Sequence, residues 1–194
     1  MPTRKLAEYQ RKRDFAKTAE PQGGQSSADD PIFVIQHHAA SSDHYDFRLE
    51  VDGVLKSWAV PKGPSVDPAD KRLAVPTEDH PMDYATFEGT IAAGEYGGGT
   101  VMVWDAGTYV NTTGHKGEPT TMADGIEAGH ITFDLTGTKL SGGFALTRTR
   151  DGAKPTWILV KKRDAAASAR RKPVISAPRS ALSGRTMRQI ATES

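Results

Sequence analysis

Short runs of alternating apolar and polar residues, separated by Gly, Pro and Asp, dominate the chain from residue 32 to residue 163. Such runs are typical of strands that bury one face, because successive side chains of a strand point to opposite sides. Many short strands without a long helical period predict an all-β fold. We expect strands at 32–38, 44–51, 54–60, 72–78, 99–104, 130–135, 142–149 and 156–163.

The segments between these strands have the composition of turns and loops. Asp52-Gly53 lies between two alternating runs, which is a strong signal for a two-residue hairpin. Residues 61–70 form a Pro-rich loop, residues 89–99 a Gly-dense loop and residues 111–129 a long polar loop.

Neither end of the chain keeps this alternation. Residues 6–17 have the composition of a short helix, and residues 21–31 that of a linker. From Ala165 onward the chain is rich in Ala, Ser and Arg, which predicts a flexible tail with a little helix near its end. The predicted organisation is an N-terminal arm and linker, a β-domain and a flexible basic tail, at residues 1–30, 31–164 and 165–194.

Composition excludes several classes of protein. The 194 residues include no cysteine, which rules out disulfides, thiolate metal sites and cysteine nucleophiles. No apolar run reaches the roughly 18 residues of a membrane helix, and the start of the chain lacks a signal-peptide pattern. We therefore expect a soluble cytoplasmic protein without a membrane partner, whose metal ligands are histidine and oxygen groups.

The net charge of +1 conceals an uneven distribution. Residues 1–20 hold six Lys/Arg and three Asp/Glu, and residues 165–194 hold six and one. The remaining residues 21–164 hold thirteen basic and twenty acidic side chains. Basic ends suggest a polyanionic partner and an acidic middle suggests cation binding, although solvated surface charges and soluble tails give the same pattern.

The densest chemistry lies in residues 36–50, QHHAASSDHYDFRLE. Alternation from residue 44 places His44, Asp46, Arg48 and Glu50 on one face of a strand, opposite an apolar face. A histidine and a carboxylate two residues apart can bind one metal ion, and Arg48 can hold an anion nearby. The same pattern would also arise from surface histidines beside a hairpin.

The preceding strand offers a third ligand, His37 or His38, and the spacing alone does not choose between them. Three nitrogen and oxygen ligands suit a catalytic Zn, Mn or Fe ion. Two reaction classes use such a set, namely Fe(II)-dependent oxygenation and metal-assisted phosphoryl chemistry. The nearby Arg48, His80 and Lys62 favour phosphoryl chemistry.

Two further segments carry candidate groups. In TEDHPMDY, residues 77–84, His80 and Tyr84 are candidate proton donors or phosphate contacts, or else a turn histidine and a packing tyrosine. The loop GEYGGGT, residues 94–100, lacks the Lys-Ser/Thr ending of a P-loop, so we expect it to provide tight turns.

Several sequence blocks occur together and in order: HYDFRL, SWAVPKGP, EDHP and GEYG–GGTV–WD–GTY. In these blocks the chain resembles the 3′-phosphoesterase module of bacterial DNA ligase D, from about Tyr9 to Asp164. The later KLSGGFALTR and WILVKKRD fit as well, and RSALSGRTMRQIA resembles the segment that follows the module. The resemblance implies a compact β-barrel of about eight antiparallel strands with a polar crater on one side.

The resemblance also implies an activity. It implies a Mn²⁺-dependent enzyme, with Zn²⁺ or Co²⁺ as other metals, that heals DNA 3′ ends during end joining. Such an enzyme removes a 3′-terminal ribonucleoside as a phosphodiesterase and then the 3′-phosphate as a phosphomonoesterase. The implied partners are DNA 3′ ends at primer–template or duplex junctions, a ligase or polymerase and Ku-type proteins, in the nucleoid. A DNA-end-binding adaptor without catalysis is the non-enzyme alternative.

Site residues follow from the resemblance by position. The implied metal ligands are His38, His44 and Asp46. Positions that grip the scissile phosphate, with a further essential polar group, fall on Arg48, His80 and Tyr84. An N-terminal arm that closes over the site corresponds to Arg13, Asp14 and Glu20, and the lining of the phosphate pocket to Gln36, Lys62 and Arg72. The chain departs from its relatives at Ser41-Ser42-Asp43, where they often have Thr-Arg-Leu, and this change beside His44 could alter substrate or metal affinity.

Overall fold

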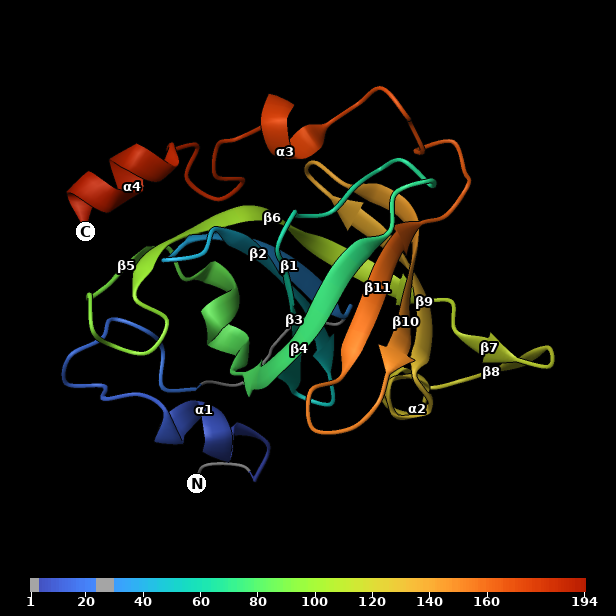
Figure 1. Cartoon of the computed structure of the whole chain (residues 1–194), viewed down its shortest axis with the longest axis horizontal. Coiled ribbons are helices and arrows are strands. Elements are labelled where there is room, and N and C mark those ends of the chain that lie inside the picture. Colours follow the sequence, from blue (N-terminus) through green and yellow to red (C-terminus); the bar gives the residue numbers. More distant parts are fainter. Residues whose placement is uncertain (1–3, 24–29) are drawn as a thin grey trace.

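The computed structural model describes residues 4–23 and 30–194 (Figure 1). The predicted linker at residues 21–31 therefore lies partly outside the described residues. Within them, the chain forms strands β1 (Ile32–Ala39), β2 (His44–Val51), β3 (Val54–Val60), β4 (Arg72–His80), β5 (Gly89–Ile91), β6 (Gly99–Asn111), β7 (Gly114–His115), β8 (Glu118–Pro119), β9 (His130–Gly137), β10 (Ser141–Arg150) and β11 (Thr156–Lys161). Its helices are η1 (Arg4–Leu6), α1 (Ala7–Arg11), η2 (Met82–Thr86), α2 (Met122–Ala128), α3 (Pro173–Ser176) and α4 (Met187–Glu193).

Eight of the described strands close into an antiparallel barrel, in the order β1-β2-β3-β4-β11-β10-β9-β6. Closure comes from β6, which pairs with β9 on one side and with β1 on the other. The short strand β5 adds to the end of β6. The predicted all-β barrel of about eight antiparallel strands is confirmed, and each predicted strand corresponds to one strand of the barrel.

The hairpin between β2 and β3 forms where the sequence predicts it. Asp52 and Gly53 both have positive φ angles, 51° and 82°, as the two central residues of a type I′ turn require. The turn sets the register that continues through the pairs Val51–Val54 and Phe47–Trp58. It therefore fixes which residues of β2 face the barrel interior.

Two apolar clusters lie on opposite sides of the barrel wall. The interior cluster draws on all eight barrel strands and includes Phe47, Trp58, Trp104 and Phe133. On β1, β3 and β6, alternate residues face the other way and form an outer cluster with η2 and α1. Most polar residues of β1, β2 and β4 that face outward near η2 and α1 are thereby buried, among them Gln36, Arg48 and His80.

Two predicted loops contain regular structure. The Gly-dense loop at 89–99 begins with β5, and the polar loop at 111–129 contains the β7–β8 hairpin and α2. Thr121 caps α2 by accepting a hydrogen bond from the backbone of Asp124. This helix escapes prediction because its apolar stripe is short, and it becomes stable only by placing Met122 against the interior cluster.

The C-terminal segment, which its composition predicts to be a flexible tail, contacts the barrel at several points. It runs over one end of the barrel, where Trp104 Nε1 donates a hydrogen bond of 2.9 Å to Ala177 O (Figure 1). Farther along, Ile190 of α4 is fully buried in the interior cluster. A single apolar anchor in a polar helix gives little periodicity, so the sequence does not reveal the packing. No helix in residues 4–23 and 30–194 has the length and apolar character to cross a membrane.

Candidate active site

Three candidate metal ligands from β1 and β2 converge on one point. His38 is the cross-strand neighbour of His44, and Asp46 lies two residues farther along the same face. The Oδ2 atom of Asp46 lies 3.4 Å from His44 Nε2 and 3.8 Å from His38 Nδ1. One ligand atom from each residue lies within 4.8 Å of the others. Strand alternation and hairpin register together are sufficient to create this cluster.

The structure also separates His37 from the cluster. Its ring stacks on Tyr45 with 4.3 Å between ring centroids, on the other side of the strand. Its Nε2 atom lies 2.9 Å from Asp43 Oδ1. His38 is therefore the histidine of β1 that joins His44 and Asp46, and the unusual Asp43 contacts His37 instead of extending the ligand set.

The cluster has the chemistry of a divalent-cation site. His44 Nδ1 lies 2.9 Å from the carbonyl oxygen of Ser42, which leaves Nε2 facing Asp46. Proteins commonly orient metal-binding histidines by such a backbone contact. The Nε2 atom of His38 is buried without a hydrogen-bond partner among the described residues. An orphaned buried nitrogen is costly, and coordination of a cation would remove that cost.

The protonation states of His38 and Asp46 also suit a cation, whereas the hydrogen bond with Asp46 raises the pKa of His44. Burial lowers the pKa of His38, which favours the neutral imidazole that a metal requires. For Asp46, burial works to raise the pKa, but the nearby Arg48, His44 and His38 outweigh it and hold the pKa below its ordinary value. The carboxylate is therefore ionised at neutral pH. Two imidazoles and a carboxylate fit Mn, Zn or Fe by donor type.

Arg48 lies beside this cluster in a fixed orientation. Its side chain is buried, and its Nη2 atom lies 3.4 Å from Asp46 Oδ2. It donates hydrogen bonds to Gln36 Oε1 at 2.7 Å and to Ser57 Oγ at 2.9 Å. Gln36 in turn donates to the carbonyl oxygen of Tyr84 at 2.8 Å. This chain of contacts holds a guanidinium next to the candidate metal ligands, where it can bind an anion.

His80, at the end of β4, is held between two tyrosine rings. The ring centroids of Tyr9 and Tyr84 lie 5.0 and 4.7 Å from its own. Its Nδ1 atom lies 2.9 Å from the carbonyl oxygen of Glu78, and its Nε2 lies 3.4 Å from a guanidinium nitrogen of Arg13. Burial, followed by the charges of Arg48 and Arg13, lowers the pKa of His80 well below its ordinary value. His80 is therefore neutral, with Nδ1 protonated and Nε2 as the acceptor.

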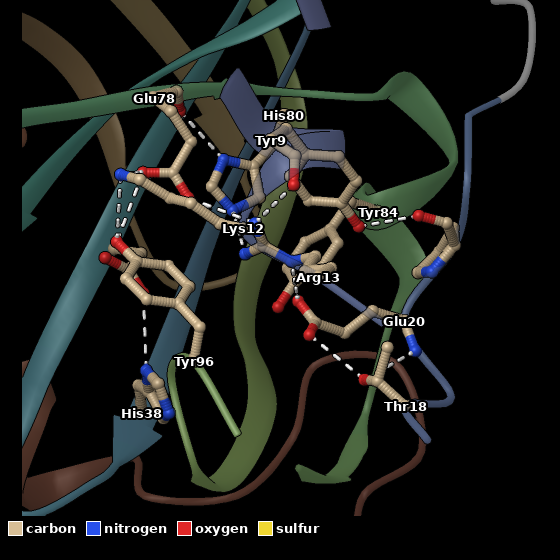
Figure 2. A network of polar contacts seen from close by, with 12 residues as sticks. Tyr9, Lys12, Arg13, Thr18, Glu20, His38, Glu78, His80, Tyr84 and Tyr96 are labelled. Atoms are coloured by element: carbon tan, nitrogen blue, oxygen red, sulfur yellow. Dashed lines mark hydrogen bonds and ion pairs between the residues drawn. The ribbon is translucent and has the colours of Figure 1, made fainter. Parts of the chain in front are cut away.

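The N-terminal arm (residues 4–23) contributes Arg13, which Figure 2 shows at the centre of a polar network. Arg13 Nε donates to Glu20 at 2.7 Å, and its Nη1 donates to Glu78 at 3.1 Å. Its guanidinium lies 3.9 Å from the ring centroid of Tyr9. The hydroxyl of Tyr9 donates to Pro21 O at 2.6 Å and so ties the arm back on itself. Two carboxylates from different segments thus fix one arginine over the site.

One cavity of about 220 Å³ unites these groups. Seven of the predicted site residues line it: Arg13, His38, His44, Asp46, Arg48, His80 and Tyr84. It also has residues that the sequence reasoning did not assign a role, chiefly Thr77, Glu78 and Tyr96. Glu78 shares a strand face with His80 in the EDHP block, and strand alternation from His80 would have found it. Tyr96 is the single bulky side chain in GEYGGG, and this isolation in a glycine-rich loop would have marked it as a candidate site residue.

Five predicted site residues lie outside this cavity. Gln36 is buried behind Arg48, and Glu20 is buried behind Arg13. Asp14 is exposed and pairs with Lys17 at 3.4 Å. Two predicted phosphate-pocket residues also lie elsewhere: Lys62, which is exposed, and Arg72, whose Nη2 lies 3.6 Å from Asp70. Gln36 and Glu20 contact the cavity indirectly. Gln36 accepts a hydrogen bond from Arg48 and Glu20 accepts one from Arg13, and both arginines line the cavity.

Comparison with known proteins finds similarity over the part of the chain that carries most of these residues. Residues 36–148 match the family model described as "DNA Ligase D 3'-phosphoesterase domain". The chain is 50% identical to the multifunctional non-homologous end joining protein LigD of Pseudomonas aeruginosa, over 96% of this chain and 22% of that protein. It is 47% identical to the corresponding LigD of Mycobacterium tuberculosis, over 75% of this chain and 18% of that protein.

The chain spans about a fifth of the length of these curated relatives. The matched region nevertheless covers more than half of this chain, and it begins at Gln36 and includes the strands that carry His38, His44, Asp46, Arg48 and His80. The polar residues enclosed on the outer face of the barrel are thus part of the matched region. The chain belongs to the 3′-phosphoesterase domain family of DNA ligase D.

Proposed function

We propose that this chain is a Mn²⁺-dependent phosphoesterase that heals DNA 3′ ends. The observation that carries the proposal is the convergence of a cation site and an anion-binding arginine on one cavity. Asp46 Oδ2 faces both His44, at 3.4 Å, and Arg48, at 3.4 Å. A metal-bound phosphate oxygen and an arginine-bound phosphate oxygen can therefore belong to the same phosphoryl group.

His38, His44 and Asp46 would hold the ion, which supplies a Lewis acid that polarises phosphorus. Arg48 binds a non-bridging oxygen and stabilises the negative charge that grows in the transition state. Because Gln36 and Ser57 already fix the guanidinium, little reorganisation is needed when the phosphate arrives. Gln36 therefore supports the chemistry by positioning Arg48.

His80 takes the proton of the attacking water at Nε2. The hydrogen bond to Glu78 O keeps the proton on Nδ1, so the lone pair is on Nε2, which faces a guanidinium nitrogen of Arg13 at 3.4 Å. In the resting site, burial and the charges of Arg48 and Arg13 make this nitrogen a weak base. An anionic phosphate in the cavity offsets those two charges and raises its proton affinity. Substrate binding therefore activates the base.

Two hydrolyses in sequence give a healed end. In the first, water adds to phosphorus and the bond to O5′ of the terminal ribonucleoside breaks, which releases the ribonucleoside and leaves a 3′-phosphate. In the second, another water releases inorganic phosphate and leaves a 3′-hydroxyl. A 3′-hydroxyl is the group that a ligase or polymerase requires. We therefore propose that the chain acts in the nucleoid beside such enzymes and Ku-type proteins at primer–template or duplex junctions.

The test is incubation of a primer–template ending in a 3′-ribonucleoside with Mn²⁺, with products resolved by length and phosphate state. We expect a 3′-phosphate intermediate followed by a 3′-hydroxyl product. His44→Ala should abolish both steps and weaken Mn²⁺ binding measured by calorimetry, because one of three ligands is lost. The matched control is His115→Ala, since His115 is an exposed histidine of β7.

Three outcomes would contradict parts of the proposal. Near-normal turnover of His44→Ala with added Mn²⁺ would mean that His44 is not a ligand of the catalytic metal. Binding of the DNA end without turnover at saturating Mn²⁺ would make the chain an end-binding adaptor. Oxidation of a 2-oxoacid with Fe(II), in place of DNA hydrolysis, would make it an oxygenase that uses the same ligand set.

A further inference from the structure

Two grooves border the cavity and share lining residues with it. One groove, of about 310 Å³, runs between α1 and β4 and is lined by Lys12, Pro76 and Tyr96 among others. The other, of about 610 Å³, is lined mainly by the small side chains and backbone of residues 93–99 with Ala40 and Ser41. Tyr96 lines both the cavity and the first groove. The tip of the loop thus stands where a substrate must pass.

Tyr96 is unusual among the large side chains of the site. It is 47% exposed, whereas Tyr9 and Tyr84 are 0% and 3% exposed. Its neighbours in the loop are mostly glycine and alanine, so the ring projects from a segment that offers it little packing. Lys12 Nζ and the Arg13 guanidinium lie over this ring, and its remaining exposed surface at the mouth of the cavity can still contact a ligand.

Two cations lie beside the ring of Tyr96, and both pair with carboxylates: Lys12 with Glu8 and Glu78, and Arg13 with Glu20 and Glu78. Lys12 Nζ lies 4.8 Å from the ring centroid and the Arg13 guanidinium 5.3 Å from it. A flat apolar face beside cations is the usual combination in single-stranded nucleic-acid sites, where bases stack and phosphates pair. Figure 2 shows the ring of Tyr96 close to Lys12 and Arg13, on the side of the network where His38 lies.

We propose that Tyr96 stacks on the base of the 3′-terminal ribonucleoside and so selects ends that carry a nucleoside. The proposal rests on the proposed function and assigns the leaving group to the groove beside Pro76 and Lys12. The scissile phosphate then lies between Arg48 and the metal ligands, and the leaving nucleoside lies outward along the cavity wall. Stacking is tolerant of base identity, since every base has a π face.

A purely structural role for Tyr96 predicts something different. Its hydroxyl lies 3.4 Å from both Lys12 Nζ and Glu78 Oε2, so it could instead latch the arm to the loop. Both distances are long for hydrogen bonds. The hydroxyl contacts are lost in Tyr96→Phe, whereas the cation contacts with Lys12 and Arg13 and any stacking both need the ring. Tyr96→Phe therefore tests the hydroxyl latch, and the comparison of ends with and without a base separates stacking from the cation contacts.

The experiment compares three primer–templates that differ only in what is attached to the terminal 3′-phosphate. One ends in a ribonucleoside, one in 1-deoxyribose, which keeps the sugar hydroxyls but lacks a base, and one in a 3′-phosphate. The measured quantity is the ratio of kcat/KM for the first end to that for the second. We expect a ratio of about ten in the wild type, a ratio near one in Tyr96→Ala and the wild-type ratio in Tyr96→Phe.

The matched control is Val110→Ala, because Val110 is 63% exposed and lies outside the cavity. It should keep the wild-type ratio. A wild-type ratio in Tyr96→Ala, or a Tyr96→Phe variant that behaves like Tyr96→Ala, would overturn the stacking role. An equal fold-loss of Tyr96→Ala on 3′-phosphate ends would overturn it too, because those ends have no leaving nucleoside. If the wild type hydrolyses none of the three ends, the proposed function is wrong. This result needs no variant, so it is distinguishable from failure of the stacking role alone.

Discussion

The N-terminal arm and the C-terminal segment both lie outside the barrel and both carry an excess of basic residues, yet they are held in opposite ways. The arm inserts Arg13 between two buried carboxylates, Glu20 and Glu78, and presents it to the cavity. The C-terminal segment is held by apolar side chains, with Ile190 buried, and by hydrogen bonds of its serines to Glu88, while Arg170 and Arg171 remain exposed. None of its described residues lines the cavity.

This difference in packing indicates how the basic residues of each segment act. A cation that is enclosed by carboxylates has a fixed position and can stabilise charge in one place, as preorganised catalytic groups do. A cation at the surface acts through its long-range field, which salt screens. The arm should therefore control turnover, and the C-terminal segment should control stability and weak, salt-sensitive contact with DNA.

Arg13→Ala should have the largest effect. It removes a donor near His80, leaves buried Glu20 without its cationic partner and leaves buried Glu78 with Lys12 alone. We expect kcat/KM on 3′-ribonucleoside ends to fall by about 10²- to 10³-fold, as when one preorganised donor is removed from an active site. Steady-state kinetics at saturating Mn²⁺ measures the loss.

The matched control for Arg13 is Lys17→Ala. Lys17 belongs to the same arm, but its side chain is 64% exposed and pairs only loosely with Asp14, at 3.4 Å. Its removal should change kcat/KM by less than about twofold, as for an exposed ion pair. If the two variants lose activity equally, net charge on the arm and not the position of Arg13 would be responsible.

Much of the barrel could be predicted because strand alternation is a local signal. The face of β2 that carries His44, Asp46 and Arg48 follows from residue parity alone. Two features do not follow from alternation. The choice of His38 over His37 comes from the family resemblance, and the β1–β2 register gives its physical reason by placing His38 opposite His44. The packing of Ile190 depends on a contact between residues far apart in sequence, which no local pattern encodes.

The predicted phosphate-pocket residues show a second limit. A resemblance indicates which positions correspond between two sequences, but it does not give the direction in which each side chain points. Gln36 and Arg48 lie on strand β1 and strand β2, so their contact is set by the barrel, and Gln36 supports Arg48 without lining the cavity. Lys62 belongs to a Pro-rich loop whose course is not set by periodicity, and the structure places it outside the cavity.

Ile190→Ala should have an intermediate effect, on stability alone. The side chain is fully buried in the interior cluster, so its truncation leaves a cavity. We expect the free energy of unfolding to fall by about 2–4 kcal/mol, measured by denaturant titration. At 25 °C kcat/KM should stay within about twofold, because the segment does not line the cavity.

Ile175→Ala is the control for this variant. Ile175 lies in α3 of the same segment and is 76% exposed, so its truncation should cost less than about 0.5 kcal/mol. Equal stabilities of Ile190→Ala and the wild type would mean that the C-terminal segment does not pack in solution. A parallel loss of kcat/KM would mean that the segment shapes the cavity, and the contrast with the arm would disappear.

The exposed arginines of the C-terminal segment should have the smallest effect, and it should be visible only through salt. Each phosphate contact adds about 0.9 to the slope of log K against log salt for duplex DNA. Replacing Arg170 and Arg171 by Gln should therefore reduce that slope by up to about 1.8, measured by fluorescence anisotropy with catalysis blocked by omitting Mn²⁺.

The control is a double change to Gln at Lys116 and Lys154, two exposed lysines in distant turns. It should leave the slope unchanged if the duplex lies along the C-terminal segment. If both double variants reduce the slope equally, the duplex is attracted by net charge and has no preferred side. If neither does, the arm supplies the DNA contacts, and the two basic ends differ even more than their packing indicates.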